Sequence, residues 1–195
     1  MYIDVSSYNG KIDWKSVAQN SEKINGVILR ATTKNDKLDT RTIENYNGIL
    51  QNMSYVDELS MYKFSYANTY VDARVECRKC INEIQSRGLH ADYLYLDLEQ
   101  HGVDYTTDSA SAVILGYIDE MAKFGVSDKF RLYFNYNYLK NIIDPIWRQI
   151  PLWLARYNST MGDTFGANVV LWQYASNGKV DGINGNVDVS KEITK

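Results

Sequence analysis

The chain has 195 residues, of which 45% are hydrophobic and 23% charged, a composition typical of a globular protein. A chain of this mass buries about 70% of its unfolded surface on folding, so we predict one domain spanning residues 1–195. The 21 basic residues do not outnumber the 24 acidic ones, and no apolar run approaches the ~20 residues of a membrane helix. We therefore expect neither nucleic-acid binding nor membrane insertion, and the N-terminus lacks the features of a signal peptide.

Aromatic residues are unusually frequent, with 16 Tyr, 4 Trp and 5 Phe. Amphipathic rings in this number suit a surface that binds a sugar or a peptide, although an aromatic core would also account for them. Cys77 and Cys80 form a single C-x-x-C inside a stretch that reads as a helix, and the two histidines do not form a spaced pair. A structural zinc needs four ligands, so we predict neither a metal nor a cofactor.

Eight apolar runs with strand character recur along the chain, and helix-like stretches separate the early ones. Asp13 and Thr40 are the predicted N-caps of the first two helices. Alternating strands and helices predict parallel pairing with right-handed crossovers. The predicted strands are residues 2–6, 26–33, 59–67, 93–99, 130–137, 152–158, 169–176 and 186–192.

This order of elements predicts an α/β fold, an irregular TIM-like β/α barrel. A regular eightfold barrel takes about 250 residues, and this chain is shorter. Residues 159–168 and 177–185 link the last three strands, and a helical crossover needs at least about 10–12 residues. We therefore predict about five β/α units followed by three strands with little helix, some of them antiparallel.

Two acidic side chains share one face of the predicted strand 93–99. Leu94, Leu96 and Leu98 lie on one face, and Asp97 and Glu99 lie on the other. If the leucines face the helices, both carboxylates point into the barrel mouth, with Cα atoms about 6.6 Å apart. They also lie at the C-terminal end of their strand, where barrel enzymes build their sites.

The first and last predicted strands repeat the pattern, with Asp4 and Asp188 each between outward-facing apolar residues. A single Asp at a strand end is often a cap or a turn former, and that alternative stays open for each of these two. Four carboxylates at one rim raise one another's pKa values, which lets one acid stay protonated while another is ionised. Glycosidic bond cleavage requires this division of roles.

Aromatic and amide side chains are predicted to surround the acids. Alternation places Tyr133, Asn135 and Trp153 on the inner face, and Tyr174 is assigned to the same surface. Alternatively, the deeper rings, such as Trp153 and Tyr93, fill the barrel. The predicted substrate-binding residues are Tyr62, Phe64, Tyr133, Asn135, Tyr157, Trp172 and Gln173.

Short segments along the whole chain form an ordered set. The opening segments are Ile3–Ser6, Tyr8–Gly10 and Ile12–Trp14. The later ones, in order, are Arg30–Thr32, Asn45–Tyr46, Tyr62–Phe64, Leu96–Glu99, Leu132–Tyr133, Pro151–Tyr157, Trp172–Tyr174 and Gly185–Asp188. Together these segments resemble glycoside hydrolase family 25, the Chalaropsis-type lysozymes.

The resemblance implies an N-acetylmuramidase that cuts the β-1,4 bond between N-acetylmuramic acid and N-acetylglucosamine in peptidoglycan. The four acids of the family fall on Asp4, Asp97, Glu99 and Asp188, with Glu99 as general acid/base. Asp97 would orient the substrate's 2-acetamido group or stabilise the oxocarbenium-like transition state, and the other two would position substrate or tune Glu99. We predict a retaining reaction with acetamido participation, because Asp97 and Glu99 lie too close on one strand to flank a water.

The chain departs from the family pattern at Thr33-Lys34, where Glu-Gly is common, at Lys63, where His is common, and at Ser190, where Asn is common. These departures bear on which wall modifications or peptide stems are accepted. Two alternatives stay open: a chitinase-like barrel glycosidase and a non-catalytic cell-wall-binding module. The expected place of action is the bacterial cell wall, reached outside the cell or by release from a host cytoplasm as a phage endolysin.

Overall fold

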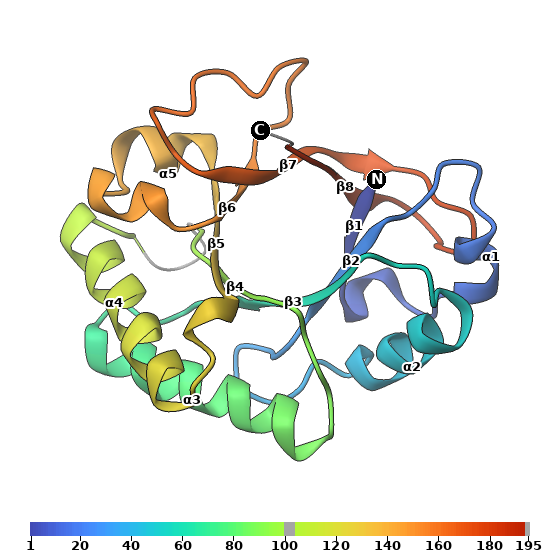
Figure 1. The fold of residues 1–195 in the computed structure, drawn as a ribbon, viewed down its shortest axis with the longest axis horizontal. Helices are drawn as coiled ribbons and strands as arrows, with labels where there is room; N and C mark the ends of the chain where they lie inside the picture. Colours follow the sequence, from blue (N-terminus) through green and yellow to red (C-terminus); the bar gives the residue numbers. More distant parts are fainter. Residues whose placement is uncertain (100–103, 194–195) are drawn as a thin grey trace.

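The computed structural model describes residues 1–99 and 104–193, and within them eight strands form one closed barrel in chain order (Figure 1). Strands β1 to β7 pair in parallel, whereas β8 is antiparallel to both β7 and β1. The strands are β1 (Tyr2–Val5), β2 (Gly26–Arg30), β3 (Glu58–Phe64), β4 (Leu94–Asp97), β5 (Phe130–Asn135), β6 (Leu152–Ala155), β7 (Val169–Gly178) and β8 (Val187–Glu192).

One α-helix follows each of the first five strands, and in the described residues none lies between β6 and β8. The prediction of five β/α units closed by three bare strands is therefore confirmed, as is the antiparallel last strand. The short final links leave no room for a helical crossover. The helices are α1 (Trp14–Ala18), α2 (Thr42–Asn52), α3 (Tyr70–Ser86), α4 (Thr107–Lys123) and α5 (Tyr136–Asn141), with 3₁₀ turns η1 (Ser7–Asn9), η2 (Ser127–Lys129) and η3 (Pro145–Gln149).

One of the two predicted helix caps is correct. The Asp13 side chain accepts hydrogen bonds from the backbone N–H groups of Lys15 and Ser16, as expected of an N-cap. The prediction for Thr40 is wrong, because α2 starts one residue later, after Arg41, without a side-chain cap. A carboxylate oxygen of Asp39 accepts the Arg41 N–H instead, so a neighbouring loop residue satisfies that donor.

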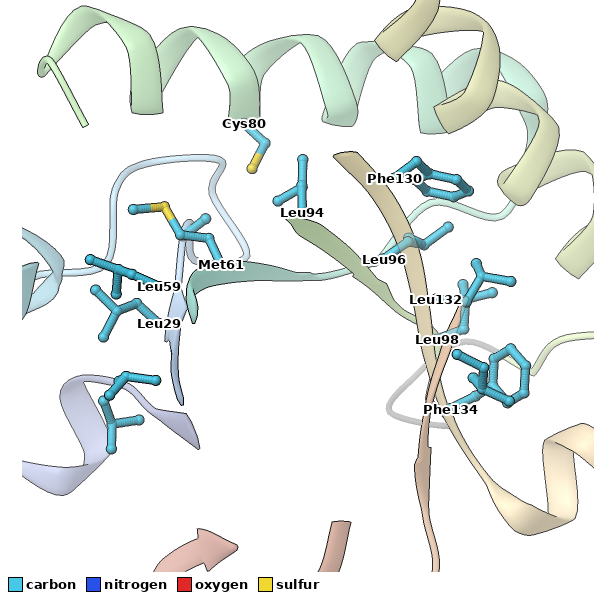
Figure 2. Close-up of a cluster of buried hydrophobic side chains, with 14 of the residues drawn as sticks. Leu29, Leu59, Met61, Cys80, Leu94, Leu96, Leu98, Phe130, Leu132 and Phe134 are labelled. Carbon is cyan, nitrogen blue, oxygen red and sulfur yellow. The ribbon is translucent and has the colours of Figure 1, made fainter. Parts of the chain in front are cut away.

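The leucines of β4 and the leucine that directly follows it pack outside the barrel. Leu94, Leu96 and Leu98 belong to the large cluster between the sheet and the helices, and Figure 2 shows them on the side of the sheet where Cys80 projects from α3. Full burial of each leucine stabilises the fold by about 1.5–3 kcal/mol. The predicted orientation of this strand is therefore confirmed.

A second, smaller cluster fills the barrel interior. The Trp153 ring lies 4.4 Å from the Tyr133 ring and 5.4 Å from the Tyr95 ring, measured between centroids. Trp153 is 2% exposed, and its Nε1–H donates to Ser190 Oγ at 3.0 Å. Trp153 is thus a core residue, the alternative that the sequence left open, and Ser190 satisfies its only polar group.

Candidate active site

Four carboxylates converge at the rim where the parallel strands end. Asp4 on β1 and Asp188 on β8 are register partners in the antiparallel pair that closes the barrel. Side chains so paired have Cβ atoms about 4.5–5.5 Å apart. Asp97 ends β4 and Glu99 follows two residues later, and the charges of Glu99 and Asp4 both act on Asp97. The structure therefore brings together the acids selected from the alternation of the sequence.

Burial and mutual repulsion perturb this cluster. Asp97 is 5% exposed, and its Oδ1 has no hydrogen-bond partner among the described residues. Burial, followed by the charges of Glu99 and Asp4, raises the pKa of Asp97 well above its ordinary value. Burial and the charge of Asp188 likewise raise the pKa of Asp4, and burial and Glu99 raise the pKa of Asp188. The site therefore favours carboxyls that hold protons at unusually high pH.

An amide connects the cluster to two tyrosines. Gln173 Nε2 donates to Asp4 Oδ2 at 2.9 Å, which opposes the rise in the pKa of Asp4. Its Oε1 accepts from the hydroxyls of Tyr133 at 2.9 Å and Tyr157 at 2.8 Å. The Tyr157 side chain is 57% exposed, so the network runs from the buried acid to the surface. Gln173 thereby fixes the orientation of the Asp4 carboxyl and of the two tyrosine hydroxyls beside it.

The wall opposite Gln173 is formed by β2 and β3 and carries Tyr62, Phe64 and Arg30. Tyr62 faces the interior, where burial and the charge of Asp4 raise the pKa of its hydroxyl. Phe64 is the register partner of Asp97 and packs on Tyr66 with ring centroids 5.1 Å apart. Arg30, the register partner of Tyr62, lowers the pKa of Asp97.

A groove with a volume of about 430 Å³ runs beside Glu99. Asn135 lies in its wall, and its Oδ1 accepts the N–H of Tyr138 at 3.1 Å, so this amide caps α5 as well as facing the groove. The volume falls within the about 300–1,000 Å³ of typical ligand sites. The lining residues are Glu99, Asn135, Tyr136, Asn137, Ala155, Arg156 and Tyr157.

The placement of Trp172 and Tyr174 on the inner face is wrong. Leu171 and Gln173 face the barrel interior, and successive strand residues point to opposite sides. Trp172 therefore lies outside, where its Nε1–H donates to the Arg156 carbonyl at 2.8 Å. Its ring packs against Tyr174 with centroids 6.0 Å apart. Trp172 supports the strand and does not line the cleft.

Two basic residues whose orientation the sequence left unclear lie on opposite sides of the sheet. Arg30 faces the mouth, with its Cζ 5.7 Å from the centroid of the exposed Tyr8 ring. Lys63 is fully buried on the outer side, where its Nζ lies 3.5 Å from Asp36 and 3.6 Å from Glu76. At this position, where the family commonly has histidine, the two carboxylates compensate the buried charge of the lysine. The alternation of Arg30 with the outward Leu29 was the signal that could have identified the inward cation.

The part of the chain that the structure describes holds no group of three or more His, Cys, Asp or Glu side chains arranged to hold a metal ion. Within that same part, no helix combines the length and apolar character needed to span a bilayer. Cys77 and Cys80 lie on α3 as buried free thiols.

Comparisons with known proteins identify the chain's relatives. A sequence model described as glycosyl hydrolases family 25 matches residues 3–183, a range that includes Asp4, Asp97 and Glu99 and ends before Asp188. The uncharacterized protein YegX of Escherichia coli K12 is 26% identical over 191 residues, or 95% of this chain and 66% of YegX. The autolytic lysozyme of Clostridium acetobutylicum is 24% identical over 97% of this chain and 54% of its own length.

Solved structures show the same fold. The modular autolysin LytC of Streptococcus pneumoniae, in complex with a synthetic peptidoglycan ligand, matches with a TM-score of 0.86 and 26% identity, over 97% of this chain and 45% of LytC. The CTP1L endolysin matches with a TM-score of 0.77 and 26% identity, over 98% of this chain and 66% of CTP1L. The chain thus spans about two thirds of the length of YegX and of CTP1L. It spans about half of the length of the Clostridium autolytic lysozyme and of LytC. With a family match over most of its length and this fold, the chain belongs to glycosyl hydrolases family 25.

Proposed function

We propose that the protein is a peptidoglycan hydrolase that cleaves the β-1,4 bond between N-acetylmuramic acid and N-acetylglucosamine. The observation that carries the proposal is the convergence of Asp4, Asp97, Glu99 and Asp188 at one rim of the barrel. Family membership and the likeness to an autolysin bound to a peptidoglycan ligand support it. The place of action that follows is the bacterial cell wall.

Glu99 is the proposed general acid/base. It follows β4 at the open rim and lines the groove, so its carboxyl can reach a glycosidic oxygen there. It would protonate the oxygen of the leaving sugar as the bond breaks, and then take a proton from the water that completes hydrolysis.

Asp97 is proposed to act on the substrate's 2-acetamido group. Leu98 lies between Asp97 and Glu99, packs outside the barrel and donates its N–H to the Tyr133 carbonyl at 2.9 Å, which continues the alternation of β4 past Asp97. The charge of Glu99 also acts on Asp97, so the two carboxyls favour joint action on one face of a sugar. The acetamido oxygen then attacks the anomeric carbon, and the Asp97 carboxylate stabilises the positive charge that forms on the acetamido nitrogen. Two displacements at that carbon give a product of retained configuration.

Asp4 and Asp188 are proposed as positioning residues. Asp4 Oδ2 accepts the hydrogen bond from Gln173, and Asp4 is 9% exposed, so its orientation is fixed before substrate arrives. Asp188 is its register partner, and the charge of Glu99 raises the pKa of Asp188, so Asp188 lies close enough to position a substrate beside the general acid.

The test separates catalysis from binding. We expect Glu99→Gln to abolish the clearing of purified cell walls while the variant still sediments with them. Clearing that persists in the variant overturns the assignment of Glu99. Release of reducing ends from chitin but not from peptidoglycan indicates a chitinase-like glycosidase, and wall binding by the unaltered protein without any release indicates a binding module. NMR of the anomer formed first tests the stereochemistry, and an inverted product excludes acetamido participation.

A further inference from the structure

A guanidinium group is held against the wall of the groove next to Glu99. Arg156 follows β6, and its Cζ lies 3.9 Å from the centroid of the Tyr136 ring. Its Nη1–H donates to the Met161 carbonyl at 2.9 Å. Stacking on one face and bonding on one edge fix the plane of the guanidinium.

The chain backbone is shaped around this side chain. The Arg156 N–H donates to the Gln173 carbonyl at 3.0 Å, and its own carbonyl accepts from Trp172, so the backbone is pinned on both sides. Gly162 has a φ of +77°, and a Cβ at that position would lie 1.5 Å from Arg156 Nη1. Only glycine lets the chain pass this close to the guanidinium.

A substrate that carries carboxylates needs a cation in the groove in order to bind beside the acids. The acids at the rim give the groove a negative field, and a substrate that carries carboxylates is repelled by that field. Arg156 is the cation among the described residues that line the groove. Its fork of N–H donors matches a carboxylate with two parallel hydrogen bonds, and its fixed orientation lowers the entropy lost on binding.

We propose that Arg156 recognises a carboxylate of the glycan substrate and thereby determines specificity for peptidoglycan over uncharged N-acetylglucosamine polymers. The inference rests on the proposed function and assigns the substrate chemistry of one wall of the same site. Two sources supply this group: the lactyl ether of muramic acid in peptide-free strands, and the acidic residues of the stem peptide in intact peptidoglycan.

The experiment compares Arg156→Met and Arg156→Lys with the unaltered protein by kcat/KM for release of reducing ends. The matched control is Arg87→Met, which removes the same charge from an exposed site whose partner, Glu83, lies on the same helix face 3.8 Å away. The substrates are intact peptidoglycan, strands stripped of peptide by an amidase, and stripped strands with the lactyl carboxyl converted to a methylamide.

We expect Arg156→Met to lower kcat/KM about 10- to 100-fold on a substrate that carries the recognised carboxylate. The kcat/KM of Arg156→Lys should lie between those of Arg156→Met and the unaltered protein, and that of Arg87→Met should equal the value of the unaltered protein. A loss on stripped strands that disappears after methylamidation assigns the lactyl group, and a loss confined to intact peptidoglycan assigns the stem peptide. Equal losses on all three substrates, or no loss on any, overturn the inference. Failure of the unaltered protein to cut peptidoglycan would instead refute the proposed function.

Discussion

Replacement of Asp97 by Asn should stabilise the fold while it removes activity. The carboxyl is 5% exposed, Oδ1 has no partner among the described residues, and the charges of Glu99 and Asp4 repel it. If the charges are separated by about the 6.6 Å Cα spacing of alternate residues in an extended chain, two unit charges repel by about 2.5 kcal/mol at an effective dielectric constant of about 20. The attraction of Arg30 and Lys63 offsets part of this, so we expect a net gain of about 1–2 kcal/mol at pH 7, or about 2–8 °C in Tm.

The pH dependence of this gain identifies its cause. The pKa of Asp97 is raised in the folded state, so between the unfolded and folded pKa values the native protein binds more protons than the unfolded chain. Its stability therefore falls as pH rises through that window, and the Asn variant escapes this fall. Thermal unfolding followed by calorimetry should show a gain at pH 7 that shrinks toward about pH 4. A loss of stability at pH 7, or a gain independent of pH, would refute the electrostatic reasoning.

Glu76 provides the matched comparison, because it is an equally buried carboxyl with partners. Its oxygens accept from Ser65 Oγ at 2.6 Å, the Tyr66 N–H at 2.9 Å and the Tyr117 hydroxyl at 2.7 Å, and Lys63 lies 3.6 Å away. Glu76→Gln should therefore lose about 2–4 kcal/mol of stability, the opposite sign to the change at Asp97.

Three further predictions concern the cleft wall and the core. Gln173→Met removes the donor to Asp4, so the pKa of Asp4 rises and the acidic limb of the kcat/KM profile should move to higher pH; an unmoved limb contradicts a role for the Asp4 carboxylate. Gly162→Ala should lower kcat/KM on peptidoglycan about 10-fold, because the added Cβ would displace the Arg156 guanidinium. Gly88→Ala is the control: Gly88 also has a positive φ, of +65°, but nothing lies within 4 Å of an added Cβ, so this variant should lose only stability, seen as a lower Tm. Burial raises the pKa of the Cys80 thiol to about 12, so thiol reagents at pH 8 should modify it only after unfolding; rapid modification of native protein contradicts this.

Local alternation and link lengths made much of the fold predictable. The pattern of leucines with Asp97 and Glu99 determined which face of β4 turns inward, because a strand has only two faces. The short links 159–168 and 177–185 excluded helices after β6. Both inferences needed only residues near in the sequence.

Features that depend on contacts across the fold were not predictable in this way. An indole ring suits a sugar and therefore favours an inward Trp172, but its neighbour Gln173 occupies the inner face. The position of the Arg156 guanidinium depends on the loop after β6, which contacts it at Gly162. Alternation along β6 cannot predict this contact. Alternation with Leu29 indicates that Arg30 faces inward, but the closed barrel is needed to show that its charge acts on Asp97.

The bond that is cut tests the proposed muramidase most directly. Purified peptidoglycan would be digested to completion, the new reducing ends would be reduced with borohydride, and the fragments would be identified by mass spectrometry. We predict fragments that end in N-acetylmuramitol, and we predict that Glu99→Gln yields none. Fragments that end in N-acetylglucosaminitol would contradict the assignment of this acid cluster to a muramidase.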